Sequence, residues 1–142
     1  MELHVVNGPN LNLVGRREPE VYGARDLGAS LGELRDALAD RAEVHLFQSN
    51  HEGVLVDYLQ EVGFRESVGI VLNAGALGHT SLALGDCLRA ITAPVVEVHI
   101  SNVHAREGFR QNSFVTPAVR GSISGLGLEG YRLAAEWLLT NT

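Results

Sequence analysis

Short apolar runs alternate along the chain with stretches whose apolar residues recur at helical spacing. The apolar runs predict five buried β-strands, at residues 3–6, 44–47, 70–72, 95–98 and 122–124. The helical spacing predicts four helices, at residues 27–42, 53–62, 81–90 and 128–139. Short buried runs separated by helices are typical of a parallel sheet covered on both faces. We therefore expect one α/β domain over residues 1–142, with a doubly wound, flavodoxin-like, five-stranded parallel sheet.

Polar side chains gather where four of the five predicted strands end. In such a fold, ligands bind in the crevice beyond the C-terminal ends of the strands. Turn and capping chemistry explains any one of these residues alone, but four strand ends together favour a site. The polar segments are NGPNLN at 7–12, QSNHE at 48–52, NAG at 73–75 with His79 close behind, and EVHISNVH at 97–104.

The composition narrows the class of protein. The chain has 142 residues, of which 45% are hydrophobic and 20% charged, as is typical of one globular domain. Its formal net charge of −6 leaves no basic surface for nucleic acid. All 11 basic residues are arginine, which excludes chemistry that depends on lysine, such as Schiff bases and P-loop phosphate binding.

Two further features bear on location. No segment approaches the ~20 consecutive apolar residues that span a bilayer, and the N-terminus opens directly into a strand pattern without a signal peptide. The single cysteine, Cys87, cannot form an internal disulfide, which favours a reducing compartment. We expect a cytoplasmic protein that makes no membrane contact.

A glycine motif near the C-terminus, GLGLEG at 125–130, matches the dinucleotide fingerprint GxGxxG. That fingerprint belongs to a βαβ unit with an acidic residue about 20 positions further on. Only 12 residues follow Gly130, so no second strand can complete the unit. The motif therefore does not indicate dinucleotide binding.

The segment GRREPEVYG at 15–23 carries a candidate general base. It makes the first strand-to-helix connection longer than the usual 2–6 residues, and long loops at this edge of a sheet are often lids. A free tyrosine has a pKa of about 10, and a guanidinium such as that of Arg17 favours the phenolate of Tyr22. A phenolate formed in this way can remove a proton. Considered alone, Tyr22 is better explained as a packed loop aromatic.

Glu97 and His99 form a candidate acid pair. Because they are two residues apart on a predicted strand, both side chains project from the same face. A carboxylate beside an imidazole fixes its tautomer and stabilises its protonated form, which makes His99 a candidate general acid. A structural histidine is the plainer alternative. Zinc bound by this pair with His51, His79 or His104 is another, but no HExxH or CxxC spacing supports it.

Two arginines and two backbone amides form a candidate anion site after the fourth strand. Arg106 and Arg110 are four residues apart, so a helical turn would align their guanidinium groups for two-point contact with a carboxylate or phosphate. The amides around Ile100 and Ser101 add donors. Pairing of the arginines with Glu107 is the plainer alternative. Taken with Tyr22 and His99, the residues favour a cofactor-free enzyme that removes a proton next to a carbonyl and then expels a leaving group.

Five segments, spread over nearly the whole chain and in the same order, strongly resemble the type II 3-dehydroquinases. Several distinct motifs in register are far more specific than any one of them. The segments are NGPNLNLVGRREPEVYG at 7–23, FQSNHEG at 47–53, NAGALGHTS at 73–81, EVHISNVHAREGFR at 97–110 and GSISGLGLEGY at 121–131.

The resemblance implies a flavodoxin-like fold, no cofactor, and loss of water from 3-dehydroquinate to give 3-dehydroshikimate in the shikimate pathway. By the same resemblance, Tyr22 removes the proton next to the ketone and Arg17 activates it. Asn10 stabilises the enolate through a bound water. His99 protonates the departing hydroxyl, supported by Glu97.

Further roles follow from the same resemblance. Asn73 and His79 match contacts to substrate hydroxyls, Gly75 lies in the same substrate-binding segment, and the amides of Ile100 and Ser101 match the carboxylate site. Arg110 is expected to hold a ring hydroxyl, and Arg106 to support the lid or site. Asp86 matches an acid that reaches a neighbouring subunit's site, because these proteins assemble as trimers and then dodecamers.

The chain departs from the family pattern at three positions, where Ala74, Leu77 and Gly78 replace a proline, an aromatic residue and a threonine. These changes leave the catalytic set intact but bear on substrate affinity and assembly. Two other hypotheses stay open on the sequence alone. One is a non-catalytic flavodoxin-like module that binds a small anion or a partner protein; the other is a metal-dependent hydrolase using Glu97 and His99.

Overall fold

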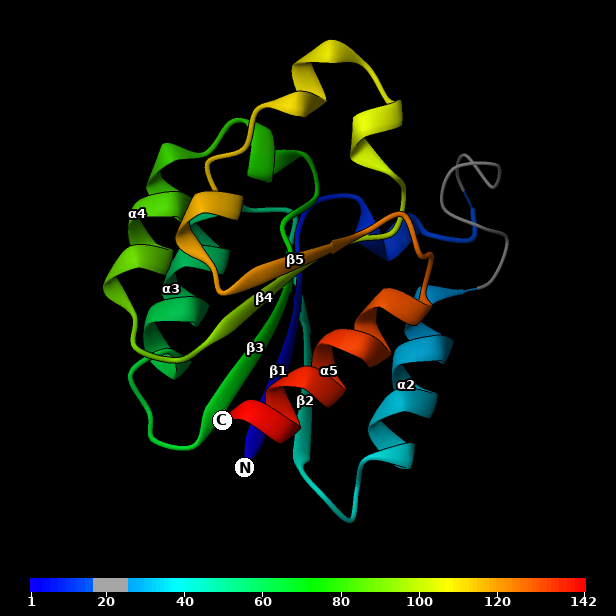
Figure 1. The fold of residues 1–142 in the computed structure, drawn as a ribbon, viewed down its shortest axis with the longest axis vertical. Helices are drawn as coiled ribbons and strands as arrows, with labels where there is room; N and C mark the ends of the chain where they lie inside the picture. The colour runs from blue at the N-terminus through cyan, green and yellow to red at the C-terminus, as the bar shows by residue number, and fades with distance from the viewer. Residues whose placement is uncertain (17–25) are drawn as a thin grey trace.

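The computed structural model describes residues 1–16 and 26–142, and in this part of the chain a parallel sheet lies between two layers of helices (Figure 1). Five strands form the sheet in the order β2-β1-β3-β4-β5, and every neighbouring pair is parallel. This confirms the predicted five-stranded, doubly wound sheet. The strands are β1 (Glu2–Asn7), β2 (Glu43–Gln48), β3 (Val68–Asn73), β4 (Val95–His99) and β5 (Gly121–Ser124).

Within the described ranges, four α-helices cover the sheet, two on each face. In Figure 1, α3 and α4 lie on one face, and α2 and α5 on the other. Side chains that alternate along β1 divide the core accordingly: Leu3 and Val5 pack with α2 and α5, whereas Val6 packs with α3 and α4. The helices are α2 (Leu27–Ala37), α3 (Glu52–Val62), α4 (Leu82–Ala90) and α5 (Glu129–Asn141).

One predicted helix boundary differs from the structure. The first helix ends at Ala37 rather than at residue 42, because Leu38 leaves the helical conformation and its carbonyl accepts from the N–H of both Arg41 and Ala42 in a turn. Leu38 and Ala42 nevertheless stay buried. The helical spacing of apolar residues therefore continues in the sequence beyond the end of the helix. The segment between β4 and β5, where no helix is among the four predicted, contains short 3-10 helices: η3 (Val103–Ala105), η4 (Gly108–Gln111) and η5 (Thr116–Ala118).

The ends of β1 and β3 approach each other closely at Gly8. Its N–H donates to the carbonyl of Asn73, and a Cβ on Gly8 would overlap the carbonyl of Ala74. Only glycine fits there, so the chain segments that leave β1 and β3 run side by side. Among the described residues, no helix is long and apolar enough to cross a membrane.

Candidate active site

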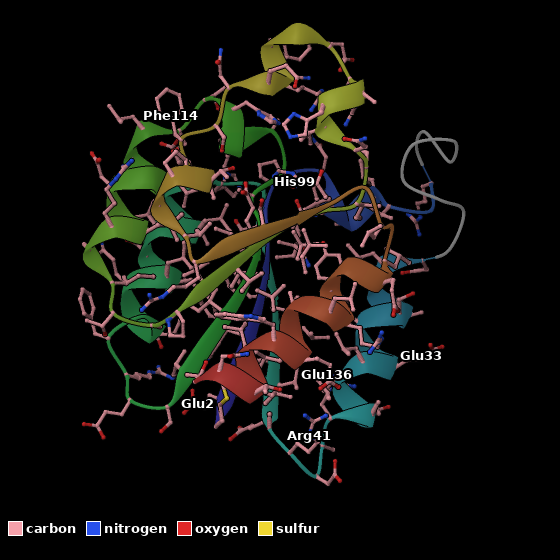
Figure 2. The ribbon with its side chains drawn as sticks, in the orientation of Figure 1. Glu2, Glu33, Arg41, His99, Phe114 and Glu136 are labelled. Carbon is pink, nitrogen blue, oxygen red and sulfur yellow. The ribbon has the colours of Figure 1, made fainter. Side chains whose placement is uncertain are left out.

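A hollow lies over the C-terminal ends of β1, β3 and β4, which is where the order of strands reverses in a sheet of this kind. Figure 2 shows His99 at this end of the sheet. Nine residues singled out in the sequence line the hollow. They are Asn10, Asn73, Gly75, His79, His99, Ile100, Ser101, Arg106 and Arg110.

Two of the other candidates, both described, do not line it. Glu97 is fully buried behind His99. Asp86 lies on α4, where its side chain is 70% exposed and 3.7 Å from a guanidinium nitrogen of Arg89. Arg17 and Tyr22 lie outside the described residues.

Glu97 holds His99 from beneath. As their spacing on β4 predicts, the two side chains share a face, and the His99 Nε2–H donates to Glu97 Oε1 at 2.7 Å. The other carboxylate oxygen, Oε2, accepts from the hydroxyl of Thr116 at 2.6 Å. A buried carboxylate is stable when its oxygens are hydrogen-bonded, and here both are. Because Nε2 is engaged by Glu97, Nδ1 is the ring nitrogen of His99 left for a ligand.

The backbone of the segment after η4 orients the ring of His79. Its Nδ1–H donates to the backbone carbonyl of Asn112 at 2.8 Å, which leaves Nε2 as the ring nitrogen that can act on a ligand. The rings of His79 and His99 are 6.1 Å apart and inclined by 22°. Two oriented imidazoles therefore line one wall of the hollow.

A buried tyrosine orients Asn73. The hydroxyl of Tyr131, on α5, accepts from Asn73 Nδ2 at 2.8 Å and donates to Asn7 Oδ1 at 2.7 Å. Burial raises the pKa of Tyr131, so the phenol keeps the proton that it donates to Asn7. Asn73 Oδ1 in turn accepts from the N–H of Gly75, at 3.2 Å. Gly75 has a φ of +60°, a conformation that glycine adopts without strain.

Asn10 is held at the rim of the hollow by its backbone. It adopts a left-handed conformation, with a φ of 69°, which asparagine tolerates better than most residues. Its N–H donates to Asn50 Oδ1 at 3.0 Å, and Gln48 Nε2 donates to that same oxygen at 3.1 Å. The side chain of Asn10 makes none of these contacts and, as far as the described residues go, is available to a ligand or water.

Arg106 and Arg110 both line the hollow, and both approach Glu107. The Nε–H of Arg110 donates to Glu107 Oε2 at 2.9 Å, and Arg106 Nε lies 3.7 Å from the same oxygen. The carboxylate also accepts from its own backbone N–H, and that bond and the two guanidinium groups hold the pKa of Glu107 below its usual value. The expected helical turn does not form; Arg106 follows η3 and Arg110 lies in η4. Both arginines therefore line the hollow while they also approach Glu107, and the anion site itself stays a prediction.

The glycine motif at 125–130 braces the end of β4. The N–H of Gly125 donates to the carbonyl of His99 at 3.2 Å, and the N–H of Gly127 to the carbonyl of Ile100 at 3.0 Å. Both glycines have positive φ, of 86° and 61°. A motif that does not indicate a nucleotide site thus holds the backbone that carries His99, Ile100 and Ser101.

Sequence reasoning missed two residues that shape the hollow. Thr116 lies 19 positions from Glu97, and Tyr131 lies 58 positions from Asn73 and 124 from Asn7. For Tyr131 the apolar spacing of the last helix indicated burial rather than a hydrogen bond, and the family-resembling segment at 121–131 includes it without assigning it a role. Zinc ligands were also considered around Glu97 and His99. In the described residues, the one group of three whose ligand atoms converge lies elsewhere, at Glu2, His4 and His45.

Comparison with known proteins gives a consistent result. The family model described as "Dehydroquinase class II" matches residues 1–139. The chain is 55% identical over 131 residues to 3-dehydroquinate dehydratase 1 of Agrobacterium fabrum, covering 92% of this chain and 90% of the relative. It is 49% identical over 144 residues to 3-dehydroquinate dehydratase of Roseiflexus castenholzii, covering 98% and 88%.

Solved structures agree with the sequence matches. The crystal structure of a type II dehydroquinase from Butyrivibrio crossotus superimposes with a TM-score of 0.93, at 41% identity and over 97% of each chain. The type II dehydroquinase from Propionibacterium acnes gives a TM-score of 0.93 at 38% identity, over 99% of this chain and 97% of that one.

Proposed function

The chain belongs to the class II dehydroquinase family, and from this premise we propose that it converts 3-dehydroquinate to 3-dehydroshikimate with loss of water. The reaction is a step of the shikimate pathway, and it makes the protein a carbon–oxygen lyase. The observation that carries the proposal is the oriented pair of Glu97 and His99 facing a hollow that also holds two arginines.

The first half of the reaction needs a base and a group that stabilises an enolate. We propose Tyr22 as the base, with Arg17 favouring its phenolate. The phenolate takes the proton from the carbon next to the ketone, and the electron pair of that bond moves onto the ketone oxygen. Asn10 lies at the rim of the hollow with its side chain available, which suits it to bind this oxygen through a water.

The second half needs an acid for the departing hydroxyl. His99 supplies it from Nδ1 as the carbon–oxygen bond breaks, the enolate collapses to the ketone, and water leaves. Glu97 stabilises the protonated imidazole, and the hydroxyl of Thr116 keeps the carboxylate in place. Tyr22 then returns its proton to solvent and His99 takes one up, so no proton is gained or lost by the enzyme.

The remaining residues bind the substrate. The backbone amides of Ile100 and Ser101 bind its carboxylate, and the guanidinium of Arg110 binds a ring hydroxyl. Arg106 supports the lid or the site. Asn73 and His79 contact further hydroxyls, and Gly75 shapes the turn beside them. We also propose that the reaction uses no cofactor, because an acid, a base and hydrogen-bond donors account for every step.

Asp86 has no place in the hollow of its own chain, which suits the proposal that it completes a site in a neighbouring subunit. Its exposed position on α4 leaves it available for such a contact. We propose that the enzyme assembles as trimers and then as a dodecamer, and that it works in the cytoplasm. Sedimentation velocity measures the assembly, and a monomer as active as any larger species would contradict it.

Ultraviolet absorbance tests the reaction, because loss of water creates a conjugated enone. We expect turnover of 3-dehydroquinate by the wild-type protein, unchanged after treatment with chelator. Tyr22→Phe and His99→Asn should each lower kcat by about 100-fold or more, the usual contribution of a general base or acid. His45→Gln, on β2 and outside the lining of the hollow, is the matched control and should keep wild-type activity.

Other outcomes favour the alternatives. Folded wild-type protein that binds 3-dehydroquinate without turnover would indicate a binding module. Activity lost to chelator and restored by metal would indicate the hydrolase hypothesis and contradict the cofactor-free proposal.

A further inference from the structure

Two Glu-x-His segments lie side by side at the N-terminal edge of the sheet. Strands β1 and β2 pair in parallel with Glu2 opposite Glu43 and His4 opposite His45. Residues two apart on a strand share a face, so the register gathers two carboxylates and two imidazoles on the side of the sheet covered by α3. Figure 2 shows Glu2 at the opposite end of the sheet from His99.

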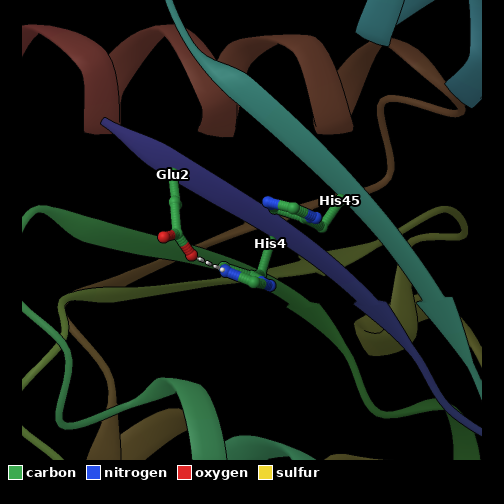
Figure 3. Close-up of side chains that lie close together, drawn as sticks. All are labelled: Glu2, His4 and His45. Atoms are coloured by element: carbon green, nitrogen blue, oxygen red, sulfur yellow. Dashed lines mark hydrogen bonds and ion pairs between the residues drawn. The ribbon is translucent and has the colours of Figure 1, made fainter.

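Three of these side chains converge closely (Figure 3). His4 Nε2 lies 3.0 Å from Glu2 Oε2, and the rings of His4 and His45 stack with centroids 4.6 Å apart. One ligand atom from each of Glu2, His4 and His45 can be chosen so that all three lie within 4.8 Å of one another. A tetrahedral ion with bonds of about 2.0–2.2 Å holds its ligands roughly 3.3–3.6 Å apart. An ion bound there would require the half-buried His45 side chain to rotate from its stacked position on His4 so that its nitrogen moves closer.

His45 carries a polar atom without a hydrogen bond. Its Nε2 is shielded from solvent and makes no hydrogen bond to any residue of the described ranges 1–16 and 26–142. Glu43 Oε1 lies 3.3 Å away, a distance suited to an ion pair but without hydrogen-bond geometry. A shielded imidazole nitrogen costs free energy unless it is satisfied, and a cation satisfies it.

His4 has the outer partner that metal-binding histidines usually have. Its Nδ1 lies 2.7 Å from the hydroxyl of Tyr58, on α3, and the side chain of His4 is only 3% exposed. When Nδ1 carries the proton and donates it to Tyr58, Nε2 presents its lone pair beside Glu2 and stays neutral. Burial lowers the pKa of His4, which favours this neutral ring.

From this geometry we propose that Glu2, His4 and His45 form a binding site for a divalent transition-metal ion such as Zn²⁺, which links β1 to β2. Two imidazoles and a carboxylate suit zinc and its neighbours in the first transition row rather than Mg²⁺ or Ca²⁺. Arg65 competes for the carboxylate, with its NH1 3.3 Å from Glu2 Oε2. It also pairs with Glu61 at 2.9 Å, so it can move to that partner when the ion enters.

Calorimetric titration of the full, chelator-treated protein with Zn²⁺ tests the site, with the visible absorption of bound Co²⁺ as a second readout. Wild-type protein should bind a single ion. His45→Gln should weaken binding by about 100-fold, and Tyr58→Phe, which removes the outer partner of His4, by about tenfold. His51→Gln removes an exposed histidine elsewhere and is the matched control, with binding unchanged.

The outcomes separate this site from the proposed catalytic one. The metal site is contradicted if wild-type protein binds no Zn²⁺, if His45→Gln binds as tightly as wild type, or if His51→Gln weakens binding equally. Turnover of 3-dehydroquinate should be the same with and without Zn²⁺, and the same in His45→Gln. Binding of Zn²⁺ by a protein without turnover would support this site and refute the proposed activity.

Discussion

The side-chain amide of Asn73 donates a hydrogen bond of 2.8 Å to the hydroxyl of Tyr131, deep beneath the hollow. The same hydroxyl donates a hydrogen bond to Asn7 Oδ1. One phenol therefore fixes polar side chains at the ends of both β1 and β3. Because Asn73 lines the hollow and Tyr131 does not, the tyrosine acts on a ligand only through the asparagine.

Replacing Tyr131 with phenylalanine tests that relationship. The change leaves Asn73 Nδ2 and Asn7 Oδ1 buried without this partner, so we expect the free energy of unfolding to fall by about 1–3 kcal/mol. A misoriented Asn73 should also lower kcat/KM for 3-dehydroquinate. Denaturant unfolding and the absorbance assay measure the two effects. Tyr58→Phe is the matched control, since it removes a half-buried hydroxyl on α3 away from the hollow, and it should keep wild-type kcat/KM.

Thr116 offers a second test, because its hydroxyl donates to the buried carboxylate of Glu97. Thr116→Val keeps the shape and removes the donor, so Glu97 is free to shift and no longer holds His99. A hydrogen bond to a charged group contributes about 1.5–3 kcal/mol to stability. If the same free energy is lost from the positioning of His99 in the transition state, kcat should fall by about 10- to 100-fold. Thr116→Ser should restore the rate. If valine and serine variants are equally slow, the hydroxyl has no positioning role.

The regular elements follow from local pattern, which is why most were predictable. Apolar runs bounded by turn residues located all five strands, although β5, with Ser122 and Ser124, was the weakest signal. The end of α2 was wrong because Leu38 and Ala42 remain buried and so continue the helical spacing after the backbone has turned. Apolar periodicity indicates which side chains are buried, but it carries no information about that change of backbone direction.

Among the site residues, too, contacts within one strand were predictable and contacts between distant segments were not. The contact between Glu97 and His99 was predictable because two positions on one strand share a face. Asn10, in the polar segment after the first strand, and Arg110, paired in spacing with Arg106, both line the hollow as well. The hydrogen bonds that orient the site join residues far apart in sequence, as between Thr116 and Glu97, and no local pattern predicts such a pair.

Glu107 leads to a third prediction. Its carboxylate pairs with Arg110 at 2.9 Å and lies 3.7 Å from Arg106. In the proposed function Arg110 binds a ring hydroxyl of the substrate with Arg106 in support, so Glu107 would compete with the substrate for these guanidinium groups. Exposed ion pairs are weak because water screens them, so Glu107→Gln should lower KM for 3-dehydroquinate by no more than about fivefold, with little change in kcat. Steady-state kinetics at low and high salt check this. A raised KM would mean that Glu107 instead holds the arginines in their binding positions.

The last prediction concerns Ala74, which stands where the family usually has proline. Its φ of −73° is one that proline adopts, and Asn73 before it ends β3 in the extended conformation that proline favours. In the described part of the chain the Ala74 N–H donates to no acceptor, so proline removes no hydrogen bond there. Ala74→Pro should therefore raise the free energy of unfolding by about 0.4–1 kcal/mol, by restricting the unfolded chain.

Denaturant unfolding measures the gain, and the absorbance assay shows whether a stiffer turn between Asn73 and Gly75 also lowers KM. Gly78→Ala is a useful companion, because a Cβ there meets Ala74, Glu97 and Val115 only at ordinary van der Waals distances of 3.8–4.0 Å. It should likewise stabilise, since alanine restricts the unfolded chain more than glycine does. If Ala74→Pro destabilises while Gly78→Ala does not, the fully buried surroundings of Ala74 have no room for the ring, and this chain has repacked around the smaller residue.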